Sequence, residues 1–131
     1  MSGKTSKPAV RKNPRRSSAM TLETVRQLAL ALPGVEEGLS YRTPAWKLGK
    51  TLLARMHQDG EALVLKMDFL ARDMLMQADP HTFFITDHYQ NYPWVLVRLS
   101  SVRREQLRGL LDDAWRSAAP KRLLAARQGG A

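Results

Sequence analysis

The side chains best suited to chemistry lie in the segment 87–94. Asp87 next to His88 could orient the imidazole as a general base, and the rings of Tyr89, Tyr92 and Trp94 could line a pocket. Neighbours in an extended segment point apart, however, and a histidine that packs with tyrosines in a turn is the commoner arrangement. We therefore predict no catalytic residue here. As an alternative function we keep a ligand pocket formed by Tyr41, His88, Tyr92 and Trp94.

The sequence contains no recognisable motif for metal binding or nucleotide binding. The absence of cysteine excludes a disulfide framework, a thiolate metal site and a cysteine nucleophile. The three histidines, His57, His81 and His88, form no HExxH motif. The patterns GxGxxG, GxxxxGK(S/T) and GxSxG do not occur either. We predict a protein that is not an enzyme and that carries no metal or cofactor.

The net charge of +9 lies at the two ends of the chain. Residues 1–20 and 120–131 contain no acid, and their nine Lys and Arg residues account for the whole excess. The body between them carries 12 basic and 12 acidic residues. Any binding of a polyanion such as DNA is therefore predicted for the ends first. The N-terminal residues that we predict to contact phosphates are Arg11, Lys12, Arg15 and Arg16.

The composition of the first 20 residues predicts a disordered basic tail, because it offers almost nothing apolar to bury. A transit peptide is the rival interpretation, but Pro8 and Pro14 would interrupt the amphipathic helix that such a peptide needs. The lack of cysteine favours the cytoplasm, and no apolar run has the roughly 18 residues of a membrane span. We expect no membrane partner.

Hydrophobic periodicity and turn residues predict three helices and five strands. The helices should follow the capping residues Thr21, Asp68 and Ser101 and end near Pro33, Pro80 and Pro120. The strands are predicted at 45–48, 51–57, 61–67, 83–86 and 94–99, with a loop at 35–42. This order, α-β-β-β-α-β-β-α, is typical of an α+β fold, a two-layer sandwich whose antiparallel sheet carries helices on one face. We expect one domain at 21–120, between a basic N-terminal tail at 1–20 and a basic C-terminal tail at 121–131.

Strand alternation predicts which side chains face the helices. The covered set comprises Leu52, Ala54, Met56, Leu63, Leu65, Met67, Val95, Val97 and Leu99. The open set comprises Leu53, Arg55, His57, Val64, Lys66, Trp94, Leu96 and Arg98. Cations beside a tryptophan on an open sheet resemble the surfaces of single-strand binders, so we predict Arg55, Lys66 and Arg98 as nucleic-acid contacts. A solvated face or an oligomer interface explains the same residues.

Four long segments of the chain read LALALPGVEEG, SYRTPAWKLGKTLLAR, DPHTFFITDHYQNYPWVLVRL and LLDDAWRSAAPKRL. Together they resemble the MmcQ/YjbR family of small bacterial proteins, and the resemblance covers about Met20 to Leu123. It implies a compact α/β domain of the CyaY-like type, also described as a double-wing DNA-binding motif. It carries over no reaction and no catalytic residues.

Two hypotheses of function follow. The first is a non-enzymatic cytoplasmic protein that binds DNA through its basic tails and the open sheet face. The second is a small-molecule or protein-binding module that uses the pocket around His88, Tyr92 and Trp94. We slightly favour a monomer.

Overall fold

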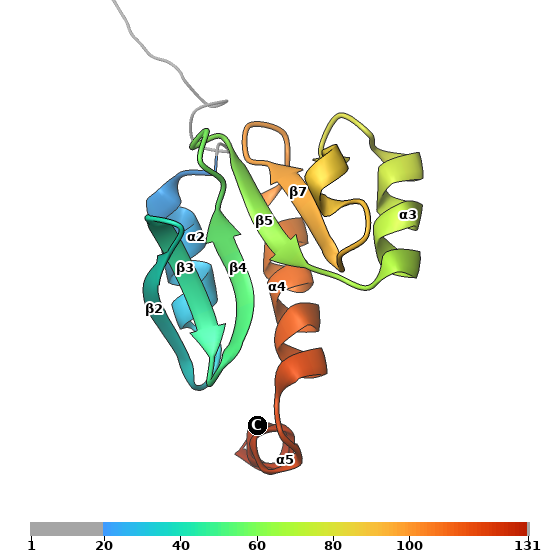
Figure 1. Ribbon diagram of the computed structural model, residues 1–131. Coiled ribbons are helices and arrows are strands. Elements are labelled where there is room, and N and C mark those ends of the chain that lie inside the picture. Colours follow the sequence, from blue (N-terminus) through green and yellow to red (C-terminus); the bar gives the residue numbers. More distant parts are fainter. Residues whose placement is uncertain (1–19, 131) are drawn as a thin grey trace, which may run out of the picture.

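The structure is a computed structural model and describes residues 20–130 of the chain (Figure 1). The predicted phosphate contacts Arg11, Lys12, Arg15 and Arg16 lie outside the described residues. The elements are, in chain order, α2 (Leu22–Leu30), β2 (Val35–Ser40), β3 (Thr43–Leu48), β4 (Thr51–Met56), β5 (Ala62–Lys66), α3 (Phe69–Ala78), β6 (Phe83–Phe84), the 3-10 helix η1 (Asp87–Tyr89), β7 (Trp94–Arg98), α4 (Arg104–Ala118) and α5 (Lys121–Gly130).

The strands form one antiparallel sheet in the order β2-β3-β4-β5-β7-β6. Helices α2 and α4 lie behind this sheet, and α3 lies beside the β6–β7 edge (Figure 1). Leu107, Leu111 and Trp115 of α4 are fully buried, and the Trp115 indole N–H donates to the carbonyl oxygen of Pro33 over 2.7 Å. The predicted α+β fold and the burial of Trp115 are confirmed.

Two of the three predicted helix caps are present. The Thr21 hydroxyl accepts a hydrogen bond from the amide of Thr24, and the Asp68 carboxylate accepts one from the amide of Ala71. The third prediction was wrong, because α4 begins at Arg104 and Ser101 does not cap it. The Ser101 hydroxyl instead forms a 2.9 Å hydrogen bond with the hydroxyl of Thr82, which joins two loop segments.

The segment Val35–Ser40, which the sequence predicted as part of a loop, is the edge strand β2. It pairs residue by residue with β3, from Val35 opposite Leu48 to Ser40 opposite Thr43. Only Val35 is buried, so the segment lacks the alternation of apolar and polar residues that marks a half-buried strand. Tyr41 and Arg42 form the two-residue turn of this hairpin and both have positive φ, at 53° and 67°.

A β-bulge exchanges the predicted faces of Leu52 and Leu53. Trp46 pairs with Ala54 but Lys47 pairs with Leu52, so one residue of β4 has no partner on β3. Leu53 is consequently part of the helix-covered core, whereas Leu52 lies on the other face of the sheet. The simple alternation rule failed here because a bulge places two consecutive side chains opposite one.

The helix-covered face otherwise follows the prediction. Val95, Val97, Leu63 and Leu65 are buried in the main core together with Ala54. The opposite face is only partly solvated, because Ala62, Val64, Tyr89 and Leu96 form a second, smaller apolar cluster there. The loop between β6 and β7 supplies Tyr89 and so covers part of the face that the sequence predicted to be open.

The segment predicted as a basic C-terminal tail contains the helix α5. Its Leu123 and Leu124 are half-buried against the main core. The Arg127 guanidinium lies over the Trp115 ring and forms a 2.6 Å ion pair with Asp112 of α4. These contacts attach α5 to the domain, although its composition is basic.

Candidate functional site

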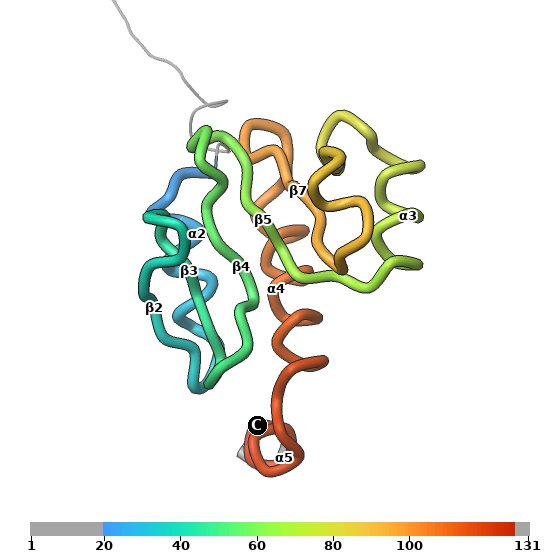
Figure 2. The backbone as a smooth tube through the Cα atoms, in the orientation of Figure 1, coloured from blue at the N-terminus to red at the C-terminus, as the bar shows by residue number. Residues whose placement is uncertain are grey.

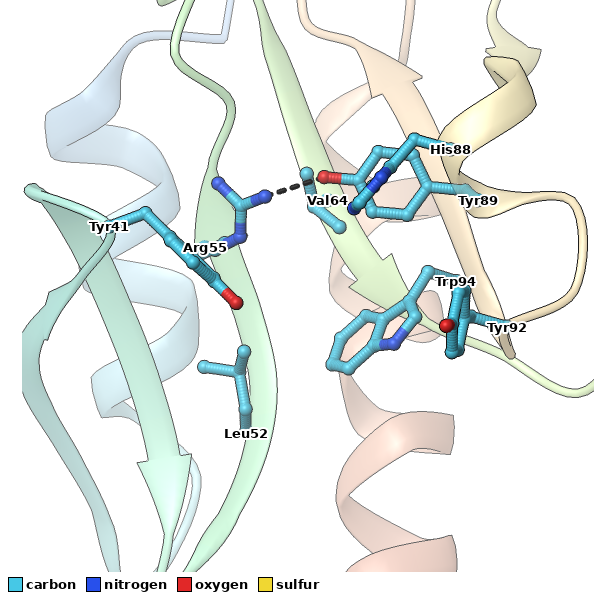
Figure 3. Close-up of a pocket in the computed structure, with 8 residues that line it drawn as sticks. All are labelled: Tyr41, Leu52, Arg55, Val64, His88, Tyr89, Tyr92 and Trp94. Carbon is cyan, nitrogen blue, oxygen red and sulfur yellow. Dashed lines mark hydrogen bonds between the residues drawn. The ribbon is translucent and has the colours of Figure 1, made fainter.

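A cavity of about 340 Å³ opens on the face of the sheet opposite α2 and α4 (Figure 3). It lies between the tip of the β2–β3 hairpin and the loop that joins β6 to β7. Eight side chains line it: Tyr41, Leu52, Arg55, Val64, His88, Tyr89, Tyr92 and Trp94. The four residues that the sequence proposed for a ligand pocket, Tyr41, His88, Tyr92 and Trp94, are thus brought together from two distant parts of the chain.

The cavity exists because β4 and β5 separate. They pair only from Ala54 opposite Leu65 to Met56 opposite Leu63. Beyond that point the two backbones diverge (Figure 2). Leu52, placed on this face by the bulge, therefore lies across a gap from Trp94, which is carried by β7 and pairs with Lys66 of β5. Val64 lies between these walls, at the base of the cavity (Figure 3).

Arg55 is the one charged side chain of this cavity that is buried, with 5% of its surface exposed. Its Nη2 donates to the phenolic oxygen of Tyr89 over 2.5 Å, and its Nη1 donates to the carbonyl oxygen of Met56 over 3.2 Å. A guanidinium has five N–H donors. No carboxylate among the described residues forms an ion pair with Arg55. A buried positive charge therefore faces the cavity without a negative partner.

Tyr41 reaches the cavity through a strained turn. Its ring lies under the Arg55 guanidinium, with 4.9 Å between the ring centre and Cζ, although 75% of the residue is exposed. The turn requires positive φ at both Tyr41 and Arg42, where Asn-Gly is the usual pair. A non-glycine residue in this region costs about 1–2 kcal/mol. Strain of this kind is concentrated at binding and catalytic sites.

The opposite wall of the cavity is held by Arg72, which the sequence analysis missed. Its Nη1 donates to the carbonyl oxygens of Tyr89, Tyr92 and Trp94 over 2.8–3.2 Å, and its Nη2 donates to that of Gln90 over 3.1 Å. Arg72 is 5% exposed, and α3 thus fixes the loop that carries His88 and Tyr92. The sequence did contain a signal for the burial of Arg72. At helical spacing Arg72 shares one face of α3 with Leu75 and Met76, and that face is otherwise apolar.

A second cavity of about 330 Å³ adjoins the first. It shares Tyr41, Arg55, His88 and Tyr89 with the first cavity and adds His57, Gln58 and Thr86. The hydrogen-bonded pair of Arg55 and Tyr89 consequently lies at the border between the two. The first cavity is mainly aromatic and aliphatic, while the second is lined by polar side chains.

The other predicted nucleic-acid contacts on the sheet lie outside the first cavity. The Lys66 ammonium is 5.5 Å from the centre of the Trp94 ring. Arg98 lies over the Phe84 ring at 4.7 Å and donates from Nε to the carbonyl oxygen of His81. Both side chains are half-buried and lie on the same face of the sheet as Arg55. The burial of Arg55 leaves it less accessible to a phosphate backbone than either of them.

The candidate acid–base pair does not assemble in the described part of the chain. No hydrogen bond joins Asp87 to His88 there, and the His88 imidazole packs edge-on against the Tyr89 ring with centroids 4.8 Å apart. His57 approaches Asp59 at 3.2 Å on the surface. Residues 20–130 contain no group of three His, Asp or Glu side chains that could hold a metal ion. None of the described helices has the length and hydrophobicity needed to cross a bilayer.

Comparison with known proteins gives a family but no described activity. The family model described as YjbR matches residues 30–117. Uncharacterised proteins of Mycobacterium tuberculosis and Mycobacterium bovis are 32% identical to this chain over 99 residues, which cover 62% of this chain and 77% of theirs. The crystal structure of Deinococcus radiodurans protein DR2400, which contains the family-model domain DUF419, is similar in fold. It gives a TM-score of 0.66 at 27% identity, covering 79% of this chain and 81% of that one.

Proposed function

This chain belongs to the YjbR family, and we propose that it is a cytoplasmic, non-enzymatic protein that binds a small organic molecule in the aromatic cavity beside Arg55. The observation that carries the proposal is the position of Arg55, whose buried charge faces a cavity without a carboxylate partner. Buried cations are normally paired, because removing a charge from water is costly. A bound molecule would supply the missing partner.

The size and lining of the cavity support the same proposal. Ligand sites typically enclose about 300–1,000 Å³ and combine apolar walls with a few polar groups that fix the orientation of the ligand. Here the walls are Leu52, Val64, Trp94 and the tyrosine rings, and Arg55 is the polar group. The four hydrogen bonds of Arg72 hold the loop side of the cavity in place, and the hairpin on the other side tolerates backbone strain at Tyr41. A merely solvated sheet face requires neither feature.

A fragment screen monitored by amide NMR tests this proposal. We expect fragments to shift the backbone resonances of Tyr41, Leu52 and the loop 87–94 and to raise the melting temperature of the protein. His88→Ala and Trp94→Ala should abolish both effects, whereas Leu30→Ala, which alters a half-exposed side chain of α2 outside the cavity, should not. A screen in which no fragment shifts the cavity residues would refute the proposal.

DNA binding is the second candidate function. It is favoured by the position of Lys66 and Arg98 on one sheet face and by the six cations among residues 1–20. If all six neutralise phosphates, the affinity should fall about a thousandfold between 50 and 200 mM salt. Deletion of residues 1–19 tests the role of the N-terminal segment in this binding. The double variant with Lys66→Ala and Arg98→Ala tests the role of the sheet. Titration with single- and double-stranded DNA at low salt that shows no binding would eliminate this candidate.

A further inference from the structure

Within residues 20–130, the ionisable side chains that line the two adjoining cavities include no acidic group other than tyrosine. Arg55 lies at the border of the two cavities, His57 and His88 line their rims, and the remaining ionisable groups are tyrosines. Among the described residues, no Asp or Glu lines either cavity. The one permanent charge is therefore positive, and a ligand with one negative charge would neutralise it.

The donors around Arg55 fit a carboxylate better than a phosphate. Two of the five guanidinium N–H groups bond to Tyr89 and Met56, which leaves N–H groups on the planar fork for an acceptor with two oxygens. Phosphate sites usually add a helix N-terminus, a glycine-rich loop or further cations. None of the residues that line the first cavity is a lysine, a glycine or a second arginine.

The walls of the first cavity fit a flat apolar body. In Figure 3 the ring of Tyr41 and the side chain of Leu52 lie on one side, the rings of Trp94 and Tyr92 lie on the other, and Val64 lies between the two sides. Aromatic rings on opposite sides of a slot bind a planar ring by stacking, which adds to the effect of apolar burial. A bound ring in this slot would extend away from Arg55 toward Leu52.

We propose that the cavity binds an aromatic carboxylate, with the carboxylate on the Arg55 guanidinium and the ring between Tyr41 and Trp94. This assignment rests on the proposed function, because it names the chemical class of the ligand for the same cavity. Tyr89 acts as a positioning residue, since its hydroxyl fixes the guanidinium from the side of the loop. The polar second cavity leaves room for a hydrophilic substituent on the ligand.

Four matched probes test the chemical class by calorimetric titration of the full chain. They are 2-naphthoate, the uncharged 2-naphthamide, 2-naphthyl phosphate and the non-aromatic cyclohexanecarboxylate. We expect 2-naphthoate to bind at least about tenfold more tightly than each of the other three, because it alone combines an aromatic ring with a single negative charge that matches the one guanidinium. Equal binding of the amide, or tighter binding of the phosphate, would overturn the assignment.

Two substitutions at Arg55 and one control locate the charge that is responsible. Arg55→Met should abolish the preference for naphthoate over naphthamide, and Arg55→Lys should reduce it, because an ammonium cannot form the paired contact. Arg98→Met is the control, since Arg98 also lies over an aromatic ring but does not line the cavity. It should leave the preference unchanged. A preference that persists in Arg55→Met would contradict the proposal.

The outcomes separate this inference from the proposed function. If naphthamide and naphthoate bind equally well and both shift the cavity resonances, the carboxylate assignment fails while the cavity remains a binding site. If none of the four probes binds, the assignment fails, and the fragment screen alone decides the proposed function.

Discussion

The Nη2 of Arg55 donates to the phenolic oxygen of Tyr89 over 2.5 Å, which joins the C-terminal end of β4 to the 3-10 helix η1, 34 residues later. Both residues are buried, and the bond spans the border between the two cavities. It gives the guanidinium one fixed orientation on the sheet. The charge is therefore preorganised for a partner, which reduces the entropy that a ligand would lose on binding.

The two residues of this bond should respond differently to substitution. Tyr89→Phe leaves the buried guanidinium without one acceptor and should lower the free energy of unfolding by about 1.5–3 kcal/mol. Arg55→Met removes the buried charge itself and keeps an unbranched side chain that resembles the aliphatic stem of arginine. Its free energy of unfolding should lie within about 1 kcal/mol of that of the wild type, because the loss of two hydrogen bonds is offset by removal of an unpaired charge that is costly to bury.

Urea unfolding at neutral pH measures both effects. Tyr92→Phe is the control for Tyr89→Phe, because the Tyr92 residue is exposed and surface changes usually alter stability by less than about 0.5 kcal/mol. A loss of more than about 3 kcal/mol in Arg55→Met would indicate that Arg55 is retained for stability and would weaken the case for a ligand.

Arg72 should be a main support of the loop that carries His88 and Tyr92. Arg72→Met removes the donors of four carbonyl groups and should cost about 2–4 kcal/mol, since each buried group left unpaired costs about 1–3 kcal/mol and water can reach some of them. Hydrogen exchange should accelerate at the amides of residues 87–94 before it does so in β4 and β5. Arg108→Met, on the exposed face of α4, is the control and should change neither quantity.

The β-bulge predicts unequal effects for two adjacent leucines. Leu53→Ala creates a cavity in the helix-covered core and should cost about 2–5 kcal/mol. Leu52→Ala only enlarges a cavity that already opens to solvent, so its cost should stay below about 1.5 kcal/mol. Thermal and urea unfolding of the two variants give the comparison. The reverse order would restore simple alternation along β4 and would contradict the register.

Glu37 should make the stability depend on pH in the acid range. Hydrogen bonds from Arg26, and a further one from the Trp46 indole, hold the pKa of the Glu37 carboxyl below its ordinary value of 4.5. The unfolded chain therefore binds this proton more readily than the folded chain. The contribution of Glu37 to stability is complete above pH 4.5 and is lost as the pH falls through the lower, folded-state pKa.

Unfolding at a series of pH values compares Glu37→Gln with Glu36→Gln. The free energy of unfolding of Glu37→Gln should fall less steeply below pH 4.5 than that of the wild type, because the amide does not titrate. The second should retain the decline, since Glu36 is exposed and forms no ion pair among the described residues. Identical pH profiles for the two variants would exclude the proposed role of Glu37.

The parts of the fold that short-range patterns specify could be predicted from the sequence. Thr21 and Asp68 cap their helices, and the apolar spacing around Trp115 placed α4 against the sheet. The strand β2 could not be recognised, because an edge strand with two glutamates and a glycine has no apolar alternation. The turn at Tyr41 and Arg42 lacks the Asn-Gly signal that usually marks such hairpins.

The aromatic residues of the candidate site could be predicted from the sequence, but the burial of its charged residue, Arg55, could not. Tyr41, His88, Tyr92 and Trp94 were grouped as a pocket, and the structure places all four around one cavity. Arg55 was expected on an open surface. Its burial depends on the loop that delivers Tyr89 over the sheet, and that loop is held by Arg72 from a third element. Such contacts between distant segments leave no periodic pattern in the sequence.

Binding of a carboxylate to Arg55 can be observed directly in the NMR resonance of the Arg55 Nε–Hε group. It can be assigned by its disappearance in Arg55→Met and followed while 2-naphthoate is added to the full chain. We expect a saturable shift of this resonance, together with shifts at Tyr41 and in the loop 87–94, and no such shift with 2-naphthamide. A resonance that stays in place while naphthoate binds elsewhere, or while no binding occurs, would exclude Arg55 as the carboxylate site.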